Sequence, residues 1–190
     1  MALTKLNARS ASALDATILT GALPAISGAN LTGVGGDNKP YFRAWLNQAQ
    51  SLSSGSQHLM TLNGESFDPD SKWDASSYRF TPAVSGQYFL KGMATFATSS
   101  DFNHGLIAIY KNGSEIATAT TENDNYNAVQ VSTIIDSDTD DYFEVKAYQN
   151  SGGDISLVAE EKKTYFFGFK LITWLILNVN VANQSVIVVN

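Results

Sequence analysis

Apolar and polar residues alternate with a period of two through most of the chain beyond residue 40. Residues 143–147 (FEVKA) place apolar side chains on one side and charges on the other, which is the pattern of a strand with one face toward water. The apolar run 106–111 leads through Asn112-Gly113 into residues 114–117. Asn-Gly between two such runs predicts a type I′ hairpin, because both central residues of that turn need a positive φ.

Further strands are predicted by aromatic and β-branched runs between turn signals, at residues 57–62, 86–96, 126–135, 154–159 and 164–171. Their spacing is typical of a sandwich or barrel, and no amphipathic helix is predicted anywhere. We therefore expect residues 39–171 to form an all-β head.

The last of these strands offers aromatic side chains to both of its faces. In residues 165–169 (YFFGF) one face is expected to cover the core, while Tyr165, Phe167 and Phe169 would meet a second subunit. A strand fully covered within one chain would show the same pattern.

The first 38 residues contain no phenylalanine, tyrosine or tryptophan, so they cannot build a core of their own. They carry spaced apolar residues, and the tripeptide Leu-Thr-Gly occurs at 19–21 and again at 31–33. Identical copies could bury such a strip along a common axis, which favours an extended trimeric stalk over residues 1–38; a flexible leader is the alternative. The predicted interface positions of the stalk are Leu19, Leu23, Ile26 and Leu31.

The third zone, residues 172–190, contains no charged residue. Residues 174–181 and 186–189 look like two more strands. A free edge of this composition would aggregate, so we expect the tail to pair with its own sheet or to be buried between subunits.

Charge and composition exclude several classes of function. The 190 residues carry 12 Lys plus Arg against 18 Asp plus Glu, a formal charge of −6. This balance disfavours nucleic acid and anionic lipid as partners, because both require an excess of cations. The absence of cysteine excludes disulfides and thiolate zinc sites, and two histidines cannot build a multi-histidine metal centre. No secretory signal and no membrane-spanning stretch is recognisable at the sequence level.

Motifs for catalysis are incomplete. Residues 64–68 (GESFD) lack the second glycine of a nucleophile elbow, and residues 33–38 lack the third glycine of a dinucleotide loop. We therefore expect a protein that is not an enzyme and that carries no organic cofactor.

One run of aspartates resembles half of a calcium loop, in which alternate carboxylates point at one cation. Its candidate ligands are Asp136, Asp138 and Asp140. Asp141 at the sixth position and Ala147 at the twelfth rule out an EF-hand. The two interpretations left are a looser calcium site and an aspartate-rich turn before a strand.

Two further acidic loops are candidate ligand-binding surfaces, because loops at one end of a head are natural recognition sites. Carboxylates beside a tryptophan suggest sugar stacking or glycoside cleavage, and the alternative is a solvated loop with a buried tryptophan. The candidate residues are Asp68, Asp70, Trp73 and Asp74 in the first loop and Glu122, Asp124 and Tyr126 in the second.

An ordered set of local patterns resembles the globular domain of complement component one-q and its tumour-necrosis-factor-like relatives. The matching segments are 41–44 (YFRA), 73–82 (WDASSYRFTP), 86–90 (GQYFL), 109–113 (IYKNG), 141–145 (DYFEV) and 165–169 (YFFGF). The resemblance covers about two-thirds of the chain and implies a ten-stranded jelly roll that assembles as a tight trimer about its aromatic closing strands. It departs from the family in having no collagen-like stalk and in continuing beyond residue 171.

Residues 14–34 resemble segments of tailed-phage fibre proteins, which precede a trimeric carboxy-terminal head. This resemblance implies a virion protein, a homotrimer that contacts other virion proteins through its amino-terminal segment and binds a host surface receptor or glycan through its head. Two alternatives are a structural virion component without a host ligand and a fibre tip that cleaves glycans.

Overall fold

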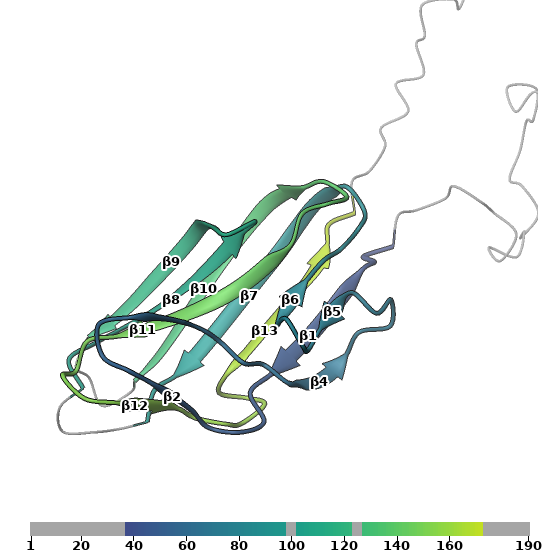
Figure 1. Ribbon diagram of the computed structural model, residues 1–190. Coiled ribbons are helices and arrows are strands. Elements are labelled where there is room, and N and C mark those ends of the chain that lie inside the picture. Colours follow the sequence, from purple (N-terminus) through teal and green to yellow (C-terminus); the bar gives the residue numbers. More distant parts are fainter. Residues whose placement is uncertain (1–36, 98–101, 123–126, 173–190) are drawn as a thin grey trace, which may run out of the picture. The chain divides into compact units, whose positions relative to one another are not determined.

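The computed structural model describes residues 37–97, 102–122 and 127–172, and within them the chain is entirely β (Figure 1). The strands are β1 (Tyr41–Trp45), β2 (Gln50–Leu52), β3 (Gln57–Leu59), β4 (Gly64–Phe67), β5 (Trp73–Asp74), β6 (Arg79–Phe80), β7 (Gly86–Thr95), β8 (His104–Lys111), β9 (Ser114–Glu122), β10 (Ala128–Ser137), β11 (Phe143–Gln149), β12 (Ile155–Leu157) and β13 (Tyr165–Lys170).

The strands form two stacked antiparallel sheets. The five-stranded sheet has the order β10-β7-β13-β1-β4, and the six-stranded sheet has the order β5-β6-β11-β8-β9, with β3 also paired to β11. A short two-stranded sheet of β2 and β12 lies at one end (Figure 1). Neighbours in each large sheet are mostly far apart in sequence, which is the connectivity of a jelly-roll sandwich. The predicted all-β sandwich is therefore confirmed.

The core lies between the two sheets and is built around a stack of aromatic rings. Phe42 of β1 stacks on Phe80 with ring centroids 4.2 Å apart and on Trp73 at 5.2 Å, and it meets the edge of Phe166 at 5.1 Å. Alternate residues of each long strand point into this layer, as the period of two requires. The aromatic core side chains are almost completely buried.

The predicted Asn-Gly hairpin is confirmed. Asn112 and Gly113 have φ angles of 51° and 79° and join β8 directly to β9, as a type I′ turn requires. Most predicted strands are present with shifted ends, whereas β2 and β4 were not expected. Their residues, Gln50–Leu52 and Gly64–Phe67, are rich in polar side chains, so their strand character comes from pairing with β12 and β1.

The predicted stalk (residues 1–36 of it) and residues 173–190 of the predicted tail lie outside the described residues. The division into three zones therefore stays a prediction. Within the described ranges, no helix has the length and hydropathy needed to cross a membrane.

Candidate functional site

The outer side of the five-stranded sheet carries a continuous set of large apolar side chains, which we call the aromatic face. Strand register aligns one row across four of the strands: Ile134 pairs with Phe89, Phe89 with Phe169, and Phe169 with Tyr41. The Tyr41 ring then meets the Phe67 ring at 5.6 Å. Ile134 is 58 % exposed and Phe67 is 44 % exposed, so the row ends in two large apolar groups that face water.

A second row of the aromatic face contains two cationic side chains. Lys91 and Arg43 flank Phe167 on the two neighbouring strands. The Arg43 guanidinium stacks over the Tyr165 ring at 4.4 Å and donates to the Glu161 carbonyl at 3.0 Å. Cations held against ring faces in this way remain compatible with an apolar surface.

A third row completes the aromatic face and comprises Met93, Tyr165 and Trp45. The Trp45 indole packs directly on Gly64 of β4, where an added Cβ would lie 2.5 Å from a ring carbon. Gly168 is equally constrained, because a Cβ there would lie 2.5 Å from Leu90 and 2.9 Å from the Phe89 carbonyl oxygen. Both glycines let bulky side chains lie close to the backbone of the sheet.

The structure places Tyr165, Phe167 and Phe169 together on this face, partly exposed, as the two-faced pattern of their strand indicated. No described element covers them. The stalk positions Leu19, Leu23, Ile26 and Leu31 lie outside the described residues.

The aromatic face also contains residues that our sequence reasoning missed, namely Tyr41, Trp45, Phe67, Phe89 and Ile134. The sequence does contain a pattern that could have indicated Tyr41 and Trp45. Residues 41–45 (YFRAW) carry large side chains on both faces of their strand, just as residues 165–169 do. An exposed apolar patch that spans a whole sheet marks an interaction surface.

The opposite outer face, on the six-stranded sheet, is polar and internally satisfied. Glu144 of β11 is only 3 % exposed and its two oxygens lie 2.9 Å from Arg79 Nε and 3.2 Å from Lys146 Nζ. These cations also cover aromatic rings, Arg79 over Tyr142 at 4.1 Å and Lys146 over Tyr110 at 4.2 Å. Burial raises the pKa of the Tyr110 hydroxyl. The charges of Glu144, Arg79 and Lys146 are therefore engaged with one another on this face.

The first predicted ligand loop requires a correction at Trp73. Its indole is 7 % exposed and stacks parallel to Phe42, with 5° between the ring planes. A ring that fills the core cannot stack on a sugar at the surface, so the alternative of a buried tryptophan is the one observed.

The carboxylates of the same loop mainly organise its backbone. Asp68 Oδ2 accepts a hydrogen bond from the backbone N–H of Trp73 at 2.7 Å. Asp74 accepts from the hydroxyls of Ser76 and Ser77, at 2.6 Å and 2.7 Å, and from the Ser76 N–H at 2.8 Å. These bonds, the Ser76 hydroxyl first, lower the pKa of Asp74 to about 2. Of this loop's predicted residues, Asp70 lines a pocket.

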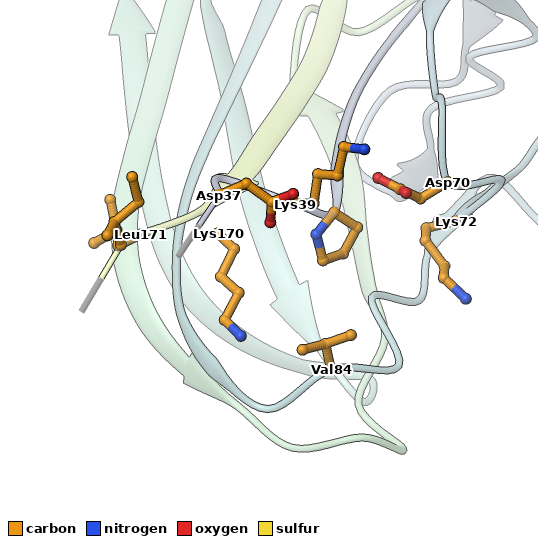
Figure 2. Close-up of a pocket in the computed structure, with 9 residues that line it drawn as sticks. Asp37, Lys39, Asp70, Lys72, Val84, Lys170 and Leu171 are labelled. Atoms are coloured by element: carbon orange, nitrogen blue, oxygen red, sulfur yellow. The ribbon is translucent and has the colours of Figure 1, made fainter. Parts of the chain in front are cut away.

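Of the candidate residues in the second predicted loop, the structure describes Glu122 alone. Glu122 is the partner of His104 across β8 and β9, and the His104 carbonyl accepts from Asn150 N–H. Asp70 lines a pocket with Lys170 (Figure 2), which pairs with Tyr88 at the start of β7. Gly105, next to His104, packs instead on Phe96, just beyond the end of β7. Asp124 and Tyr126 fall outside the described residues. The described residues Glu122 and Asp70 therefore lie at opposite ends of β7 and do not share one surface.

The aspartate-rich turn is organised by Asp141 rather than by the predicted calcium ligands. Asp141 is 5 % exposed and accepts from Lys111 Nζ at 2.8 Å, from Asn112 Nδ2 at 2.6 Å and from the Asp138 N–H at 2.6 Å. Burial alone would raise the pKa of Asp141, but these donors outweigh it and hold the pKa below its ordinary value.

Asp136, Asp138 and Asp140 are not brought together as a metal centre. In the described part of the chain, no group of three or more carboxylate or imidazole side chains could hold a metal ion. The geometry gives the turn interpretation more support, and calcium binding stays a prediction.

Comparison with known proteins identifies the fold and nothing narrower. No protein-family model and no curated protein sequence match the chain. Among solved structures, murine APRIL at pH 5.0 superposes with a TM-score of 0.56 at 12 % identity, covering 69 % of this chain and 98 % of that one. The globular domain of the zebrafish complement 1qA protein gives 0.51 at 14 % identity, covering 70 % and 98 %. The Eiger TNF of S. frugiperda gives 0.50 at 12 % identity, covering 69 % and 91 %. The head therefore has the TNF/C1q-like jelly-roll fold that the ordered sequence patterns predicted.

Proposed function

We propose that the chain is a virion protein, a subunit of a phage tail fibre or spike whose trimeric head attaches the particle to a host surface. The observation that carries the proposal is the aromatic face. Its row from Ile134 to Phe67 crosses five strands, and none of the described elements covers it. Burying an apolar face of this extent against another surface is favourable, so such a face marks an interaction site.

Threefold assembly follows from the resemblance in the sequence, which implies trimers about the closing strand. β13 lies at the centre of the five-stranded sheet, between β7 and β1, so a partner that covers Phe167 and Phe169 also covers the strands on either side. The segment 14–34, which resembles phage fibre proteins, supports a virion location, and its shared apolar strip would align three heads.

Attachment through such a head works by multivalency. Three modest binding sites on one particle act together, because the second and third binding events occur at a high effective concentration. The polar face of the six-stranded sheet and the loops at either end stay available when the aromatic faces are buried. The head itself performs no bond-breaking chemistry in this proposal.

Light scattering on the full chain at micromolar concentration tests the assembly. We expect about three times the 20.5 kDa mass of one chain; a stable single chain would refute the proposal. An antibody against the full chain should then label the fibres or spikes of intact particles. Label confined to the capsid shell would favour the structural alternative.

Competition separates attachment from a purely structural role. Soluble trimer added to host cells should reduce adsorption of the virus in proportion to the fraction of receptors that it occupies. Unchanged adsorption at saturating trimer would mean that the head has no host ligand.

A further inference from the structure

Lys91 lies within the aromatic face, surrounded by uncharged side chains. β7, which carries it, is the second of the five strands in its sheet, so Lys91 is not on an edge strand (Figure 1). Its neighbours on the face are Phe89 and Met93 on the same strand, Phe167 on β13 and Ser132 on β10. Three of these four side chains are apolar, and none can neutralise an ammonium group.

The ammonium group of Lys91 forms no ion pair with the residues that the structure describes. Lys111, Lys146 and Lys163 differ from it, because each has a carboxylate oxygen nearby, at 2.8, 3.2 and 2.9 Å. Lys146 also covers the Tyr110 ring at 4.2 Å. In the isolated head, Lys91 therefore depends on water for its solvation.

Arg43, the other cation of the same row, is already engaged within its own chain. Its guanidinium lies 4.4 Å from the centre of the Tyr165 ring and donates to the Glu161 carbonyl oxygen at 3.0 Å. A carboxylate oxygen of Glu161 lies 3.9 Å from Arg43 Nε. Arg43 keeps these contacts when another surface covers the face, whereas Lys91 exchanges water for whatever that surface presents.

A surface that covers the Phe89 and Phe167 rings also covers Lys91. The centroids of these two rings are 6.0 Å apart, and Lys91 is paired with Phe167 and follows Phe89 on the same side of β7. An ammonium group that loses water without gaining an acceptor strongly opposes association. A carboxylate in contact with that group compensates for the loss and fixes the register of the two surfaces.

We infer that a carboxylate of a neighbouring copy of this chain contacts the Lys91 ammonium in the assembled head. The inference rests on the proposed assembly through the aromatic face and adds a polar requirement to it. A second copy suits this requirement, because the chain carries 18 Asp plus Glu against 12 Lys plus Arg and so has carboxylates in excess. Lys91 then determines which surface of the neighbour binds, since a purely apolar surface would leave it unpaired.

Lys91→Met in the full chain gives results of opposite sign with and without the neighbour's carboxylate. Methionine keeps an unbranched apolar side chain and removes the charge. With the carboxylate in place, the variant leaves it buried and unpaired, so the concentration at which trimers dissociate should rise at least about tenfold. Light scattering over a dilution series measures that concentration. Dissociation at the wild-type concentration or below it would overturn the inference, because methionine would then only have removed the cost of covering a cation.

Two further variants separate charge from position. Lys91→Arg keeps a cation in the face and should retain most of the wild-type affinity. Lys72→Met makes the same chemical change between β4 and β5, outside the five-stranded sheet, and should leave dissociation unchanged. Equal weakening by Lys72→Met and Lys91→Met would show that the effect comes from net charge alone and would overturn the inference.

Cross-linking identifies the carboxylate. A carbodiimide joins a lysine to a carboxylate in contact with it, and trimers assembled from mixed ¹⁵N-labelled and unlabelled chains show whether the two groups belong to different copies. We expect peptides that join Lys91 of one isotope to an aspartate or glutamate of the other. Cross-links from Lys91 that stay within one isotope would contradict the inference.

The same dilution series distinguishes this inference from the proposed function. A wild-type chain that stays single would refute both. A wild-type trimer that Lys91→Met leaves as stable as before, or makes more stable, would overturn the Lys91 contact alone and leave the trimeric head in place.

Discussion

The outer faces of the two sheets differ in what covers their aromatic rings and what pairs with their cations. Both carry tyrosines and cations. On the six-stranded sheet, Glu144 forms ion pairs with both Arg79 and Lys146, and these cations cover the Tyr142 and Tyr110 rings. On the five-stranded sheet the rings mainly contact one another, as Phe89 does with Phe167 at 6.0 Å and Phe169 at 5.4 Å.

Of these two surfaces, only the polar face is complete within one chain. The polar face satisfies its own charges and needs no partner, whereas the aromatic face leaves apolar area in contact with water. Hydrophobic burial supplies most of the free energy of association, so assembly is expected to use the five-stranded sheet and to leave the other sheet exposed.

The largest expected effect comes from placing a charge in the aromatic face. Phe169→Glu places a charge in the row of the aromatic face, and burying an unpaired carboxylate costs several kcal/mol. We expect the mass by light scattering to fall from three chains to one. Tyr148→Glu on β11, in the outer face of the six-stranded sheet, is the matched control and should leave the mass unchanged; equal dissociation by both variants would remove the distinction between the faces.

A smaller effect is expected on the polar face. Glu144→Ala leaves Arg79 and Lys146 without their shared carboxylate, and we expect the free energy of unfolding to fall by about 2 kcal/mol. The loss is limited because the Arg79 and Lys146 side chains are 40 % and 25 % exposed and can be hydrated.

Urea denaturation measures the Glu144 effect. Glu160→Ala removes an exposed ion pair with Lys163 and should cost less than about 0.5 kcal/mol. Similar losses in the two variants would show that the Glu144 network is no more than a surface pair.

The third prediction concerns the turn between β10 and β11. Because the folded pKa of Asp141 is lowered, its contribution to stability is present above the ordinary pKa of an aspartate and is lost as the pH falls through the folded value. Asp141→Ala should lower the free energy of unfolding by about 1 kcal/mol at pH 7.

Acid denaturation followed by circular dichroism checks this prediction. The wild-type protein should lose stability on acidification more steeply than the Asp141→Ala variant. Parallel acid profiles would contradict the role assigned to Asp141.

The smallest effect is local to an exposed turn. Asp74 should titrate with a pKa of about 2 in an NMR experiment, and Ser76→Ala should raise that pKa toward the ordinary value of 3.8, because it removes the strongest donor. The contribution of Asp74 to stability is present above 3.8 and is lost as the pH falls through about 2. An unchanged pKa in Ser76→Ala would mean that the turn does not depend on that hydroxyl.

Local patterns were sufficient wherever neighbours in the chain decide the conformation. Asn112-Gly113 predicted its hairpin because the turn chemistry lies within two residues. Residues 143–147 and 165–169 predicted their strands because side chains alternate between the faces of any strand. The two-faced aromatic pattern of β13 even indicated the partly exposed surface, although not its extent.

The candidate site was harder to predict from the sequence, because its residues come from segments that are far apart in the chain. The carboxylates of the first acidic loop suggested a surface site, but the position of Trp73 depends on Phe42 and Phe166, which approach it only when the two sheets stack. Likewise, β4 carries too little apolar pattern to predict a strand and exists through its pairing with β1.

The all-β class, the hairpin, the strand periodicity and the negative net charge could be read from the sequence, because they follow from composition and from residues close together in the chain. Which aromatic residues fill the core, which charges pair, and which residues line the pocket beside Asp70 became clear from the folded structure alone. Those outcomes depend on strand register and sheet stacking, which join residues as far apart as Tyr41 and Phe169 and are fixed only when the whole head folds.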